Sequence, residues 1–126
     1  MSEKIKDFYE LNAWKKAHEF VLEIYKITKK FPKEELYGIT SQLRRAASSI
    51  GANIAEGFSR YHYNDKIKFY HNARGSLSET QNFLFLAKDL SFLIEKEFKY
   101  LFGFSEEVNK LINGLIRSIE RQKQDY

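Results

Sequence analysis

Hydrophobic residues recur along most of this chain at alternating steps of three and four, the spacing that places side chains on one face of an α-helix. Short breaks separate four such stretches, and the expected helices cover about residues 11–30, 40–56, 64–92 and 95–121. Pro32 is expected to stop the first helix, because proline lacks an N–H donor and disfavours helix at the preceding residue. Amphipathic helices joined by short connections pack antiparallel. The pattern therefore predicts an all-α, antiparallel up-down-up-down four-helix bundle, with a single domain over residues 1–126.

The same spacing predicts which side chains face the core. In the second helix the expected inward positions are Leu43, Ala46, Ala47, Ile50 and Ile54. The last helix follows a strict heptad alternation, with expected inward positions at Phe98, Leu101, Ser105, Val108, Ile112, Leu115 and Ile119.

Small residues indicate where helices are expected to approach one another closely. Ala47, Gly51 and Ala55 are four residues apart and form a smooth ridge along the second helix. Gly75 lies inside the third helix at a cost of up to ~1 kcal/mol relative to Ala, which predicts a close crossing or a bend. Gly57 is expected to take the left-handed conformation just past the second helix.

Aromatic residues are more numerous than the inward faces need. They make up 16% of the chain, and several lie partly off the inward stripes: Phe58, Tyr61, Tyr63, Phe69, Phe83, Phe85, Phe92, Tyr100 and Phe104. In a monomer many of these rings would form an exposed apolar patch, which typically marks an interface. The sequence therefore predicts self-association into a homo-oligomer.

Composition narrows the class of protein. The 126 residues include no cysteine, which excludes disulfide scaffolds and thiolate metal sites, and only six glycines and one proline, which disfavours a sandwich or barrel. The first residues are charged and resemble no signal peptide, and no apolar run approaches the roughly 20 residues that span a bilayer. We expect a cytoplasmic protein that does not associate with membranes.

The net positive charge is concentrated in one part of the sequence. The chain has 21 basic and 17 acidic residues, giving +4. Residues 40–76 hold two acidic side chains and six basic ones, namely Arg44, Arg45, Arg60, Lys66, Lys68 and Arg74. These six are the candidate nucleic-acid-binding residues, with Tyr61, His62 and Tyr63 as possible stacking partners for bases. The alternative, an ordinary solvated face with interface ion pairs, is equally consistent with the sequence.

Arg44 and Arg45 cannot serve one task equally. Adjacent helical positions lie about 100° apart around the axis. One of the two is expected to reach solvent beside Gln42, while the other borders the core.

No residue pattern characteristic of an enzyme or a metal site is present. His18, His62 and His71 do not fall at the spacing that puts two ligands on one helical face. Glu56 and Glu79 could form a catalytic or metal-binding pair, but pairing with an arginine such as Arg45 or Arg74 is the favoured interpretation. The sequence thus predicts a protein that is not an enzyme and that needs no cofactor or metal.

Three segments carry a family resemblance: residues 37–50 (YGITSQLRRAASSI), 53–57 (NIAEG) with Arg60, and 73–76 (ARGS) followed by Glu79. They resemble the four-helix-bundle proteins encoded by intervening sequences within 23S ribosomal RNA genes, with the accessory protein of diversity-generating retroelements as a relative. The resemblance implies a ring-like homopentamer without enzymatic activity, for which nucleic-acid binding is the usual proposal. Its retroelement relatives imply nucleic acid and a reverse transcriptase as possible partners.

Two functional hypotheses follow. The first is a non-catalytic homo-oligomer that binds structured RNA weakly, mainly through phosphates. The second is a structural or adaptor oligomer whose surface recruits another protein. One contiguous, exposed row of the six basic side chains would favour the first hypothesis, whereas scattered or buried arginines would favour the second.

Overall fold

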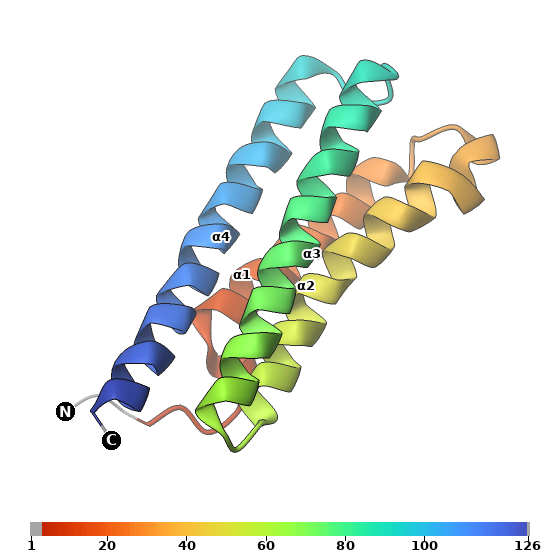
Figure 1. Cartoon of the computed structure of the whole chain (residues 1–126). Coiled ribbons are helices and arrows are strands. Elements are labelled where there is room, and N and C mark those ends of the chain that lie inside the picture. The colour runs from red at the N-terminus through yellow and green to blue at the C-terminus, as the bar shows by residue number, and fades with distance from the viewer. Residues whose placement is uncertain (1–3, 126) are drawn as a thin grey trace.

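The computed structural model of the chain describes residues 4–125 and contains four long helices: α1 (Asn12–Thr28), α2 (Ser41–Ser59), α3 (Tyr63–Asp89) and α4 (Glu95–Gln124). Short helical turns precede α1 and join α1 to α2: η1 (Phe8–Glu10), η2 (Lys33–Glu35) and η3 (Leu36–Thr40). Successive long helices run in opposite directions, and each packs against two neighbours (Figure 1). The predicted all-α four-helix bundle is confirmed. The α1–α2 and α3–α4 connections lie toward one end of the bundle, and the α2–α3 connection lies at the other, beside the end of α4 (Figure 1).

In α2 the buried side chains are the ones that the hydrophobic spacing of the sequence predicts to face inward. All five expected inward side chains, from Leu43 to Ile54, have no exposed surface. The most extensive helix pair is α2 with α3. Near the connected ends of these two helices, Tyr70 is 1% exposed, and burial raises the pKa of its phenol to about 12.

Gly57 does not end α2, contrary to the sequence prediction. The helix continues to Ser59, and no glycine of residues 4–125 has a positive φ. A Cβ on Gly57 would lie 2.7 Å from Cε1 of Tyr70 and 3.1 Å from Cβ of Phe69. The absence of a side chain at Gly57 therefore makes room for the ring of Tyr70 and the Cβ of Phe69, a requirement set by another helix that the local sequence does not reveal.

The close crossing expected at Gly75 is also absent. A Cβ there would meet no atom within 4 Å, and α3 continues through the position. Gly51, in contrast, lies against α1, because its Cβ would be 3.5 Å from Nε1 of Trp14. The small-residue ridge of α2 thus accommodates an indole ring.

The inward face of α4 departs from the strict heptad in its last turns. Ile116 is buried, and Leu115, which the heptad placed inward, is only half-buried. An uncoiled helix has 3.6 residues per turn, so its buried face drifts steadily away from a repeat of 3.5. The shift by one residue is the accumulated drift.

The α3–α4 connection is a tight Schellman turn. Ser91 has φ of 66°, the amide of Phe92 donates to the carbonyl of Ala87 at 2.8 Å, and the amide of Ser91 donates to the carbonyl of Lys88 at 2.9 Å. The turn brings α4 back along α3. At the start of α4 the carboxylate of Glu97 accepts from the Ile94 amide and from Lys30, which joins the end of α1 to α4.

Candidate nucleic-acid interface

The six basic candidates do not form one row. Arg44 reaches toward α1, Arg45 toward α3 and Arg74 toward α4, whereas Arg60, Lys66 and Lys68 belong to the α2–α3 connection and the turns beside it. The local charge surplus in the sequence is therefore divided over different faces of the bundle.

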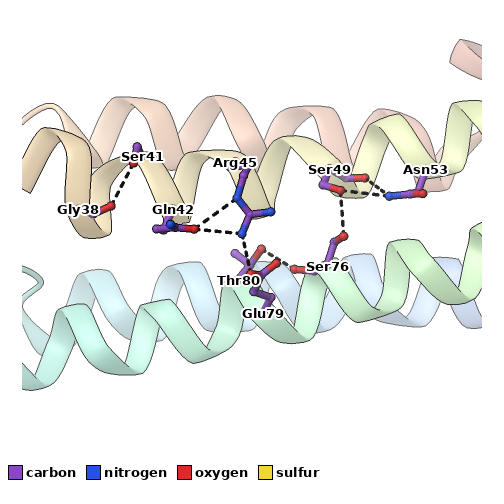
Figure 2. Close-up of polar contacts among 9 residues, drawn as sticks. All are labelled: Gly38, Ser41, Gln42, Arg45, Ser49, Asn53, Ser76, Glu79 and Thr80. Carbon is purple, nitrogen blue, oxygen red and sulfur yellow. Dashed lines mark hydrogen bonds and ion pairs between the residues drawn. The ribbon is translucent and has the colours of Figure 1, made fainter.

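The two adjacent arginines have separate tasks, as the sequence predicts. Arg45 is exposed beside Gln42, and its Nη2 donates to Oε2 of Glu79 at 2.6 Å and to Oε1 of Gln42 at 3.1 Å (Figure 2). Arg44 is half-buried and donates from Nε to Oγ1 of Thr28 at 2.9 Å. Of the two interpretations of Glu79, the ion pair with Arg45 is the one present.

Residues of the family signature connect α2 to α3. The hydroxyls of Ser49 and Ser76 lie 3.0 Å apart, and Nδ2 of Asn53 donates to the carbonyl and the hydroxyl of Ser49 (Figure 2). Thr80 donates to the carbonyl of Ser76 at 2.8 Å. This polar seam satisfies hydrogen-bonding groups between tightly packed helices, so these residues serve packing.

Arg74 also joins helices. Its Nη1 donates to Oδ1 of Asn113 on α4 at 2.9 Å, and its Nη2 lies 3.0 Å from Nδ1 of His71. The guanidinium is thereby committed to the α3–α4 contact rather than presented to a ligand.

The remaining three candidates lie near the α2–α3 connection. Arg60 pairs with Glu56 at 2.6 Å and covers the ring of Phe69 at 4.6 Å. Lys66 donates from Nζ to the carbonyl of Phe58 at 2.7 Å, and its burial lowers the pKa of its ammonium. Lys68 is exposed and has no ion pair with any residue that the structure describes.

Aromatic rings are exposed at the same end of the bundle. Tyr61 is 88% exposed and meets the exposed ring of His62 edge-on, with centroids 5.1 Å apart. An open pocket is lined by Tyr61, His62, Tyr63 and Lys123. Lys123 comes from the end of α4, about sixty residues further along the chain, so sequence position alone did not associate it with the tyrosines. Glu120 lies with Lys123 along an adjoining pocket, so this end carries both signs of charge.

The three histidines lie in different settings. His18 stacks on Trp14 with centroids 4.7 Å apart, while His62 meets Tyr61 and His71 meets Arg74. Within residues 4–125, no three His, Asp or Glu side chains come together as a set of metal ligands. No helix in that range combines the length and apolarity needed to cross a membrane.

The model of the family named 23S rRNA-intervening sequence protein matches residues 9–114. The chain belongs to this family. The sequence resemblance is thus confirmed, and the match extends over all four helices, although α4 continues beyond it.

A solved structure shares the fold. It is the crystal structure of a protein of unknown function from the S23 ribosomal protein family of Bacteroides thetaiotaomicron VPI-5482. The two chains are 26% identical with a TM-score of 0.78, and the similarity covers 83% of this chain and 95% of the other. No curated protein matches this member of the intervening-sequence family.

Proposed function

We propose that this member of the 23S rRNA-intervening sequence protein family is a non-catalytic, self-associating bundle that binds RNA at its α2–α3 end. The observation that carries the proposal is the ring of Tyr61, 88% exposed beside His62 and Lys123 on an open pocket. A base stacked on an aromatic ring contributes about 1–3 kcal/mol, and any base can supply the interaction. An exposed ring beside a lysine matches the two chemical parts of a single-stranded nucleotide, its base and its phosphate.

The proposal assigns only some of the six basic residues predicted from the sequence to RNA binding, and it adds Lys123. Lys68 and Lys123 are assigned to phosphate, Tyr61 and His62 to bases, and Arg60 to a secondary role because Glu56 already holds it. Arg45 and Arg74 are assigned to helix packing.

Few cations per chain imply weak binding, since each phosphate contact contributes little alone. Self-association would multiply the contacts through avidity, and the homopentamer implied by the family resemblance would present five such ends. A cytoplasmic location, where cellular RNA is found, is part of the proposal.

Two observations favour the adaptor hypothesis. Arg44, Arg45 and Arg74 are divided among different faces of the bundle, which is the arrangement expected of an adaptor. Phe85, Leu86, Leu90 and Ile94, around the α3–α4 connection, are between 44% and 62% exposed. Apolar side chains gathered at one end suit a protein partner or a second copy of the chain. If RNA binding fails, this surface makes recruitment of a protein, such as a reverse transcriptase, the better account.

Fluorescence anisotropy with a labelled single-stranded RNA tests the proposal. Tyr61→Ala should weaken binding about tenfold, the effect of one lost stacking contact. Tyr37→Ala is the matched control, because Tyr37 is 92% exposed but lies on η3 between α1 and α2. Equal losses in the two variants, or no binding by the parent at low salt, would favour the adaptor hypothesis.

A further inference from the structure

The end of α1 and the start of α2 lie at the end of the bundle away from the α2–α3 connection (Figure 1). A second cationic site lies between them. Its pocket is lined by Lys29, Lys33 and Arg44, by the hydroxyl residues Thr28 and Thr40, and by apolar side chains that include Phe31 and Leu36. No carboxylate belongs to this lining. The nearest acidic residues in the sequence are Glu34 and Glu35, and the carboxylate of Glu35 lies against Gly38.

Arg44 is held in place with its terminal amino groups unused. Nε donates to Oγ1 of Thr28, whose own hydroxyl donates to the carbonyl of Ile24 at 2.7 Å. The guanidinium also lies 4.8 Å from the ring centroid of Tyr25. Among residues 4–125, Nη1 and Nη2 have no hydrogen-bond acceptor and Arg44 has no ion pair. A fixed guanidinium with both outer nitrogens available suits a two-point contact with an oxyanion.

Lys29 and Lys33 add to the positive charge of Arg44, and no carboxylate that the structure describes neutralises them. Lys29 and Lys33 are exposed and form no ion pair with any described carboxylate, whereas the neighbouring Lys30 pairs with Glu97. Three cations around one pocket favour an anion in it, because each repels the others until a negative charge is bound.

The hydroxyl of Thr40 is independent evidence for a ligand, because it lacks a hydrogen-bond partner within residues 4–125. The Thr40 side chain is 3% exposed, and its Oγ1 is buried without a hydrogen-bond partner among the described residues. Buried hydroxyls are normally satisfied, and Thr40 is one of the residues that line this pocket, so its unpartnered hydroxyl is the nearest candidate donor to a ligand oxygen there.

We propose that this pocket binds a phosphate group, with Arg44 as the two-point donor, the Thr40 hydroxyl as a third donor, and Lys29 and Lys33 neutralising the charge. Phe31 and Leu36 give the pocket an apolar wall for the organic group that carries the phosphate. The same chemistry occurs in a free nucleotide and in an RNA chain. The site is independent of the α2–α3 end, so either proposal can fail without the other.

Titration of the full-length protein with inorganic phosphate, followed by ³¹P NMR line broadening or calorimetry, tests the site. The double variant Lys29→Gln/Lys33→Gln should weaken phosphate binding about tenfold, as expected for lost contacts to a charged ligand. Lys96→Gln/Lys99→Gln, which removes two exposed lysines of α4, should leave it within about twofold, because neither lysine lines the pocket and exposed charges are screened.

Thr40→Val separates ligand binding from folding. Valine has the shape of threonine without the hydroxyl, and that hydroxyl has no partner here, so the melting temperature should stay the same or rise. Phosphate affinity should fall severalfold. Competition by a nucleoside monophosphate would identify a small ligand, and competition by RNA with hydroxyl ends would identify the RNA backbone.

A parent protein that does not bind phosphate at millimolar concentration overturns the proposal. Equal affinity in the parent and in Lys29→Gln/Lys33→Gln overturns it as well, and so does an equal loss in Lys96→Gln/Lys99→Gln. Unchanged phosphate affinity in Thr40→Val overturns the site as assigned, because the orphaned hydroxyl is part of it.

Discussion

Adding one methyl group at Gly57 of α2 tests how closely Tyr70 and Phe69 of α3 pack against this glycine. A Cβ at this position would lie 2.7 Å from Cε1 and 2.9 Å from Cδ1 of Tyr70, and 3.1 Å from Cβ of Phe69. Tyr70 is 1% exposed, so its ring has no open space into which it can turn. Overpacking of this kind typically destabilises by about 1–3 kcal/mol, and the better helix propensity of alanine returns up to ~1 kcal/mol. We expect Gly57→Ala to lower the free energy of unfolding by about 1–2 kcal/mol.

The chain supplies matched controls for this substitution. At Gly75 and Gly103 a Cβ would meet nothing within 4 Å, and both residues lie inside long helices. Gly75→Ala and Gly103→Ala should therefore stabilise by up to ~1 kcal/mol through helix propensity alone. Urea unfolding followed by circular dichroism, at one protein concentration, measures all three variants. A Gly57→Ala protein as stable as Gly75→Ala would refute the close α2–α3 approach.

Three further predictions concern the end turns and the assembly. Ser91→Gly should raise the free energy of unfolding by about 1 kcal/mol, because glycine adopts the observed φ of 66° without the strain of a side chain; an unchanged melting curve would contradict the turn geometry. The hydrogen bond from Lys30 lowers the pKa of Glu97, so the Glu97 carboxylate is protonated at higher pH in the unfolded chain than in the folded one. The stabilisation of the fold by this pair is therefore fully present above the ordinary pKa of Glu. It is lost as the pH falls through the pKa that Glu97 has in the folded protein. Glu97→Gln should thus be less stable than the parent near neutral pH and converge with it in acid, and a difference independent of pH would refute the pairing. Light scattering should give a mass several times that of the chain, most simply fivefold, and a monomer would exclude self-association.

The sequence predicted the elements well because each helix carries its own periodic pattern. The buried face of α2 follows from local spacing alone. The different contacts of Arg44 and Arg45 also follow from it, since adjacent helical residues must point in different directions. The shift from Leu115 to Ile116 was missed because a short heptad pattern does not distinguish a supercoiled helix from a straight one.

The other misjudged features depend on contacts between helices. Gly57 and Gly75 are equivalent by propensity, and only the ring of Tyr70 gives one of them a packing role. Counting charge along residues 40–76 could not show that three of their four arginines contact three different helices. The two candidate sites draw Lys123 and Thr40 from places where local pattern gives no signal of a ligand.

Ultraviolet cross-linking of the full-length protein to single-stranded RNA, with the attached peptides identified by mass spectrometry, tests RNA binding at the α2–α3 end most directly. Short-wavelength light couples bases to rings stacked on them, so the contact itself is recorded. The account predicts adducts on Tyr61 and His62, together with contacts near Lys123 at the end of α4. Adducts confined to the apolar end around Phe85 and Ile94, or no adducts at RNA concentrations that saturate binding, would contradict it.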